Sequence, residues 1–181
     1  MNTTLNKIKA AGACEDRYKI LLKNLGKTKA DDEEITIRQI LISNGIQDAI
    51  WALRAVEGKD KEIRLFACDC AEMVLPIFEE KYPDDMRPRR AIEVSRRYAN
   101  EDATKEELIA VWLAAELAAM SAARAAGAAA GSAVWSAARA AMSVVELAAG
   151  AAAGSAVWSA VWSAARAAGE DIEKLFMNLI H

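Results

Sequence analysis

Few residues in this 181-residue chain could do chemistry. Cys68 and Cys70 flank Asp69, and the single histidine is His181. Cysteines two residues apart on a helix point in different directions, so a zinc site would have to recruit Cys14 and distant carboxylates. We therefore expect buried thiols that behave as small apolar side chains, and no bound metal.

Groups for catalysis are equally scarce. The serines stand among alanines with no histidine to act as their base, and no glycine-rich phosphate loop is present. Paired carboxylates could do acid–base work, but helix caps and solvated first turns explain them better: Asp31-Asp32, Glu79-Glu80, Asp84-Asp85 and Glu106-Glu107. The sequence thus predicts no catalytic residue, no cofactor and no enzymatic activity.

An arginine cluster is the strongest chemical feature, and its members are Arg87, Arg89, Arg90, Arg96 and Arg97. Three of them surround an expected helix start, where free backbone amides favour an anion. One interpretation is a site at Arg87, Arg89, Arg90 and Arg97 for a protein partner or an anionic small molecule. The favoured interpretation is pairing with nearby carboxylates: Glu79, Glu80, Asp84, Asp85 and Glu93.

Composition restricts the class of protein. Hydrophobic residues make up 54% of the chain, but many are alanine, which indicates helix more than membrane. A net charge of −3 gives no basic field for nucleic acid. Three cysteines and the lack of a leader-like segment in residues 1–13 predict a cytoplasmic protein with reduced thiols.

Short helices are predicted for the first half of the chain. Residues 31–57 read as two helices separated at Asn44-Gly45, with seven apolar side chains facing inward: Ile37, Ile40, Leu41, Ile46, Ile50, Trp51 and Leu53. A third helix covers residues 59–81, and Pro76 predicts a kink or an early end near residues 73–75.

Two more helix starts can be recognised. Pro88 predicts the first turn of a helix that runs to about Ala99, capped by an aspartate of the preceding loop. Thr104 and Glu107 have the spacing of a capping box, which predicts the start of a long helix.

The alanine-rich tail contains an internal repeat. Residues 126–133 recur at 149–156, followed each time by Val-Trp-Ser. Polar residues keep one helical face until about Ala148 and then change face, which predicts a turn near Gly150 and an antiparallel hairpin. Trp158 and Trp162 would either fill its core or bind a partner. A membrane hairpin is disfavoured, because alanine and serine insert weakly and arginines interrupt the segment.

The predicted fold is therefore all-α: a multi-helix bundle of short N-terminal helices followed by a long alanine-rich antiparallel hairpin. We expect a charge-rich region at 1–103 and the hairpin at 104–181, packed as one unit. The sticky tail also predicts a homo-oligomer.

A family resemblance lies in residues 35–100. Ser43-Asn44-Gly45 and Trp51-Ala52-Leu53-Arg54-Ala55 are followed by residues 64–72, residues 74–79, Tyr82-Pro83-Asp84-Asp85 and Arg87-Pro88-Arg89. This pattern resembles a family of immunity proteins of bacterial toxin systems, also found in phages. The resemblance implies a helical, non-enzymatic protein that neutralises a toxin by binding it, and it identifies no binding residues.

Three hypotheses follow. The leading one is an inhibitor that binds a protein partner, either a toxin or a host defence protein blocked by a phage. The second is a binder of an anionic small molecule, such as a nucleotide signal, at the arginine cluster. The third is a structural oligomer built on the tail. No nucleic acid and no membrane partner are expected.

Overall fold

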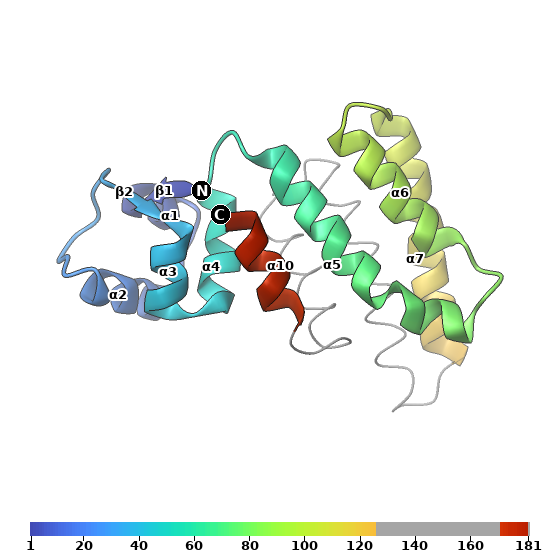
Figure 1. Ribbon diagram of the computed structural model, residues 1–181, viewed down its shortest axis with the longest axis horizontal. Coiled ribbons are helices and arrows are strands. Elements are labelled where there is room, and N and C mark those ends of the chain that lie inside the picture. The colour runs from blue at the N-terminus through green and yellow to red at the C-terminus, as the bar shows by residue number, and fades with distance from the viewer. Residues whose placement is uncertain (126–170, 181) are drawn as a thin grey trace. The chain divides into compact units, whose positions relative to one another are not determined.

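The computed structural model describes residues 1–125 and 171–180, and it divides into two compact units (Figure 1). The first comprises Met1–Lys59 with Ile180, and the second comprises Asp60–Leu179. Most of the described residues are helical, as the sequence predicted. The compositional boundary between residues 103 and 104 stays a prediction.

A small antiparallel sheet in the first unit corrects the all-α prediction. Strand β1 (Asn2–Thr4) pairs with β2 (Glu34–Thr36), with Thr3 opposite Ile35. Thr3 is buried, and its hydroxyl donates to the carbonyl of Ala55. Three-residue strands are too short to show alternating hydrophobicity, and the paired residues are at least 30 positions apart, so the local sequence carried no signal for this sheet.

Five short helices complete the first unit: α1 (Leu5–Ala10), α2 (Glu15–Asn24), α3 (Ile37–Asn44), α4 (Ile46–Ala52) and the 3₁₀ turn η1 (Leu53–Ala55). The predicted break is confirmed, because Gly45 has a φ of 86° and both ends α3 and precedes α4. Thr36 and Gln39 form a capping box, so α3 begins at Ile37.

The predicted inner faces of these helices are largely confirmed. The buried members are Ile37, Ile40, Ile50 and Leu53, while Leu41, Ile46 and Trp51 are half-buried. The Arg54 guanidinium lies 4.2 Å from the centre of the Trp51 ring, so part of that ring faces a cation at the surface.

The second unit begins with a helix that passes through a proline. Helix α5 (Asp60–Lys81) continues beyond Pro76, so an early end near residues 73–75 is wrong, and the alternative of a kink there stays a prediction. Pro76 is exposed, and the flanking Leu75 and Phe78 are fully buried. Burying two large side chains contributes roughly 3–6 kcal/mol, which offsets the roughly 3 kcal/mol that a proline costs inside a helix.

The two predicted helix starts are both present. Helix α6 (Arg87–Ala99) carries Pro88 in its first turn and packs against α5 and α7. Helix α7 (Lys105–Ala125) begins after a capping box: the Thr104 amide donates to Glu107 at 2.8 Å, and the Glu107 amide donates to the Thr104 hydroxyl at 3.2 Å. Both starts were therefore legible from local sequence.

The last described helix, α10 (Asp171–Ile180), contributes to the core of the second unit through Phe176. The ring centroids of Phe176 and Phe66 lie 5.8 Å apart. The predicted turn near Gly150, the hairpin, Trp158 and Trp162 all lie outside the described residues. Among the described helices, none is both long and apolar enough to cross a membrane.

Candidate functional site

The arginine face of α6 is the candidate site, and it begins with a carboxylate clamp. Arg87 donates from Nε to Asp85 Oδ1 at 2.8 Å and from Nη2 to Oδ2 at 2.6 Å. The Arg87 backbone amide also donates to Asp85, but the N-cap of α6 is Met86, which makes no side-chain capping bond, so the predicted aspartate cap is wrong. This hydrogen bonding lowers the pKa of Asp85 and raises the pKa of Arg87.

The next arginines join α6 to α5. Arg89 makes a two-point contact with Glu79, at 2.6 and 2.7 Å, which raises the pKa of Arg89. Arg96 pairs with Asp69 at 2.7 Å and with Glu72. Asp85 and Glu79 were among the carboxylates predicted to pair with the arginine cluster. Asp69 and Glu72 were not, because they lie 24 or more residues before Arg96.

Arg97 holds the connection between α6 and α7. It donates to the Asp102 carbonyl at 2.8 Å and to the Glu107 carboxylate at 3.3 Å. The pKa of Glu107 is lowered, first by the Thr104 amide and then by Arg97. Three of the four arginines expected to bind a ligand, Arg87, Arg89 and Arg97, therefore already have carboxylate partners within the chain.

Arg90 is the exception in this cluster. Its side chain is exposed, and no carboxylate among the described residues pairs with it. It borders an open hollow of about 680 Å³ formed by the loop before α6, together with Lys81, Tyr82 and Asp84. The Tyr82 hydroxyl is buried and has no hydrogen-bond partner. One exposed cation beside a carboxylate makes a weak site for a free anion.

The two cysteines of α5 are part of the core. Cys68 and Cys70 are fully buried, and burial raises the pKa of Cys68 to about 12 and raises that of Cys70 further. Such thiols are protonated and unreactive at neutral pH. In the part of the chain that the structure describes, no three His, Cys, Asp or Glu side chains come together in a way that could hold a metal.

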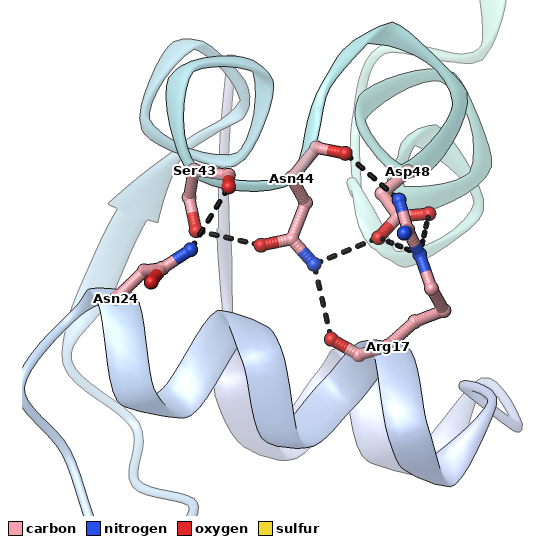
Figure 2. A network of polar contacts seen from close by, with 5 residues as sticks. All are labelled: Arg17, Asn24, Ser43, Asn44 and Asp48. Atoms are coloured by element: carbon pink, nitrogen blue, oxygen red, sulfur yellow. Dashed lines mark hydrogen bonds and ion pairs between the residues drawn. The ribbon is translucent and has the colours of Figure 1, made fainter.

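A polar network in the first unit was not foreseen from the sequence (Figure 2). The Asn44 amide donates to the Arg17 carbonyl at 3.0 Å and to Asp48 at 2.7 Å, while Arg17 donates to the Asn44 carbonyl at 2.8 Å. Asn24 donates to the Ser43 carbonyl at 2.9 Å. The network fixes the end of α3 against α2, and its signal is the Ser43-Asn44-Gly45 motif itself.

Exposed apolar side chains were also missed. Ile42 on α3 is 77% exposed and Ile20 on α2 is 41% exposed. On α7, Ile109 and Leu113 are about half exposed and lie one helical turn apart. Helical periodicity predicts that these residues are apolar positions, but only the packing shows which face is left open.

Comparisons with known proteins give one family. No curated protein and no solved structure matches the chain. Residues 54–174, well over half of the chain, match the family described as Imm-5 like putative immunity protein. The resemblance seen in the sequence is thereby confirmed, and the chain belongs to this family of immunity proteins.

Proposed function

We propose that this chain is a non-enzymatic binding protein that neutralises a protein toxin by forming a complex with it. Membership of the immunity family over residues 54–174 is the observation that carries the proposal. The buried, protonated thiols and the internally paired arginines of α5 and α6 are consistent with it, since neither set is poised for catalysis. Inhibition by occupancy needs a stable surface and no reactive group.

Ion pairing also weighs against the alternative of an anionic small molecule at the arginine cluster. A free anion would have to displace Asp85 from Arg87 or Glu79 from Arg89, and both carboxylates contact their arginine at two points. Arg90 is the cluster member available to a partner protein. Trp158 and Trp162 stay predicted partner contacts, and oligomerisation through the tail stays a prediction.

Co-expression with a panel of bacterial protein toxins, beginning with the products of the neighbouring genes, tests the proposed function. We expect growth to be restored, with the two proteins eluting together at a fixed ratio and the toxin unchanged in mass. Restored growth with a chemically altered toxin, or with the immunity protein at far less than one equivalent, would show an enzyme instead.

Arg90→Glu tests the contact proposed for α6. It should weaken the complex about tenfold or more while the helical circular dichroism signal is kept. The reason is that a cation facing an anionic group of the partner is replaced by an anion, which repels that group. Lys174→Glu on α10 changes an exposed cation elsewhere and is the matched control. Equal weakening by both variants would indicate a general charge effect rather than a contact at Arg90.

A further inference from the structure

We propose that α2 and α3 form a docking surface for an acidic segment of the partner protein that carries an exposed apolar side chain. This inference rests on the proposed function and adds to it a location and a partner chemistry. We call this surface the α2–α3 patch. Asn24, Gln39 and Ile42 line its hollow, and it also includes the exposed Ile20, Lys23 and Arg38 of the same two packed helices.

The apolar centre of the patch is Ile42. Its neighbours on α3, Ile37 and Ile40, are buried to within 1% of complete burial, whereas Ile42 is 77% exposed. Ile42 lies beside an open hollow of about 380 Å³ that is also lined by Asn24 and Gln39. An isoleucine at the edge of an unfilled hollow gives an apolar side chain of a partner both a contact and a space to occupy.

The patch is held in a fixed shape before any partner arrives. Asn24 of α2 donates to the Ser43 carbonyl next to Ile42, and Arg17 and Asn44 exchange hydrogen bonds between the same two helices (Figure 2). These contacts give hydrogen-bond donors to the Ser43 and Asn44 carbonyl groups at the end of α3. A surface that is already ordered loses little conformational entropy when it binds.

The charge around the patch indicates an acidic occupant. Arg38 lies one turn before Ile42 on α3, and Lys23 lies on the face of α2 that carries Ile20. Both side chains are exposed, and neither pairs with a carboxylate in the described part of the chain, unlike Arg17 and Lys19 nearby. Helix α3 contains no acidic residue, and Asp16 lies a turn before Ile20, at the far end of α2 from the hollow.

The wider charge distribution agrees with this chemistry. Residues 1–59 contain ten lysines and arginines and eight acidic residues, whereas residues 60–181 contain thirteen and eighteen. The unit that carries the patch is therefore positive within a negative protein. The patch lies outside residues 54–174, the part of the chain that the family match covers.

A methyl NMR titration of the full chain tests the proposal. The probe is a helical peptide with leucines at positions i and i+4 flanked by glutamates, and its control carries lysines in place of the glutamates. We expect the Ile42 and Ile20 methyl signals to shift with the glutamate peptide and to require at least about ten times more lysine peptide. Ile109, exposed on α7, is the internal control and should not shift.

Two variants sharpen the titration. Ile42→Asp should abolish the shift at Ile20, and Arg38→Glu should reverse the preference between the peptides, with folding checked by circular dichroism. Both positions are exposed, so both variants should fold.

Several outcomes would overturn the proposal. Equal binding of both peptides would mean simple hydrophobic adhesion, and an equal shift at Ile109 would mean a non-specific effect. If the Ile42 and Ile20 methyl signals shift with protein concentration in the absence of peptide, the patch binds a second copy of this chain. If they shift only with phosphatidylserine vesicles, the patch binds a membrane. If Ile42→Asp neutralises the toxin as well as the wild type does, the docking surface is wrong and the proposed function stands; failure of the wild type to neutralise refutes the function itself.

Discussion

The two units use polar side chains in different ways. In the first unit, side chains often donate to backbone carbonyls of a neighbouring helix: Asn44 and Arg17 exchange bonds to each other's carbonyls, and Tyr18 donates to the carbonyl of Leu5. In the second unit, carboxylates and guanidinium groups meet across helices, as Arg89 and Glu79 do. Short helices have many unpaired backbone ends for their length, whereas long helices mostly need to be held in register.

Because of this difference, we expect different kinds of substitution to lower the stability of each unit. The first unit should be sensitive to the backbone geometry of its connections, and its largely exposed ion pairs, such as Arg17 with Asp48, should add only a small dependence on pH. The second should depend on its apolar core, with a small contribution from charge that falls at low pH. The following predictions test this contrast.

The largest expected contrast concerns thiol reactivity. Cys14 in the first unit is exposed, whereas Cys68 and Cys70 in the second are buried with raised pKa values. A disulfide reagent should label one thiol of native protein quickly and the other two at least about a thousandfold more slowly, because labelling them needs the core to open. Counting labelled thiols with and without denaturant checks this. Rapid labelling of all three would mean that the α5 core opens readily.

Phe176→Ala should have the largest effect on stability. The ring is fully buried against Phe66, so its removal should lower the free energy of unfolding by about 3–5 kcal/mol. Chemical denaturation followed by circular dichroism measures this loss. Leu113→Ala on α7 removes a half-exposed apolar side chain and should change stability by less than about 0.5 kcal/mol. Similar losses in both variants would argue against a core centred on Phe176.

Gly45→Ala tests the backbone of the first unit. Gly45 has φ 86° and ψ 174°, a conformation that side chains avoid, although nothing lies within 4 Å of the added methyl group. The variant should lose about 1–3 kcal/mol through backbone strain alone, although alanine is the better helix former. The exposed Gln47→Ala on α4 is the control. A more stable Gly45→Ala protein would mean that α3 and α4 can merge into one helix.

Asp85→Asn should have the smallest effect, and only through pH. The pKa of Asp85 is lowered by Arg87, so its carboxylate stabilises the fold above its ordinary pKa near 4, and the contribution disappears as the pH falls through the lowered pKa. The variant should lose at most about 1 kcal/mol at pH 7 and converge with the wild type near pH 2. Urea midpoints across this range test it. Asp84→Asn, at the exposed neighbouring position, is the matched control and should leave the stability at pH 7 nearly unchanged.

Sequence reasoning succeeded where the signal was local. The break at Gly45, the capping box at Thr104 and Glu107, and the proline start of α6 each depend on residues within one turn of one another. The pairing of Arg87 with Asp85 was predicted for the same reason.

The failures arose where distant residues decide the outcome. The pairing of Thr3 with Ile35 and the partners of Arg96 depend on the tertiary fold. Helix α5 passes through Pro76 because buried neighbours outweigh a local penalty. The exposure of Ile42, which centres the α2–α3 patch, likewise follows from how α2 and α3 pack rather than from the pattern on α3 alone.

The pairing of β1 with β2 has a consequence for the order in which the chain folds. Asn2 pairs with Thr36, the Met1 carbonyl accepts from the Ile37 amide, and the Thr3 hydroxyl donates to the carbonyl of Ala55. During synthesis, residues 2–4 therefore meet their strand partners only after at least 30 further residues have been made, and Thr3 meets Ala55 only after 52, whereas α5, α6 and α7 can dock as soon as each is made. Strand β1 should thus be secured late, and a pause in translation before its partners are made would leave it exposed to proteases and chaperones.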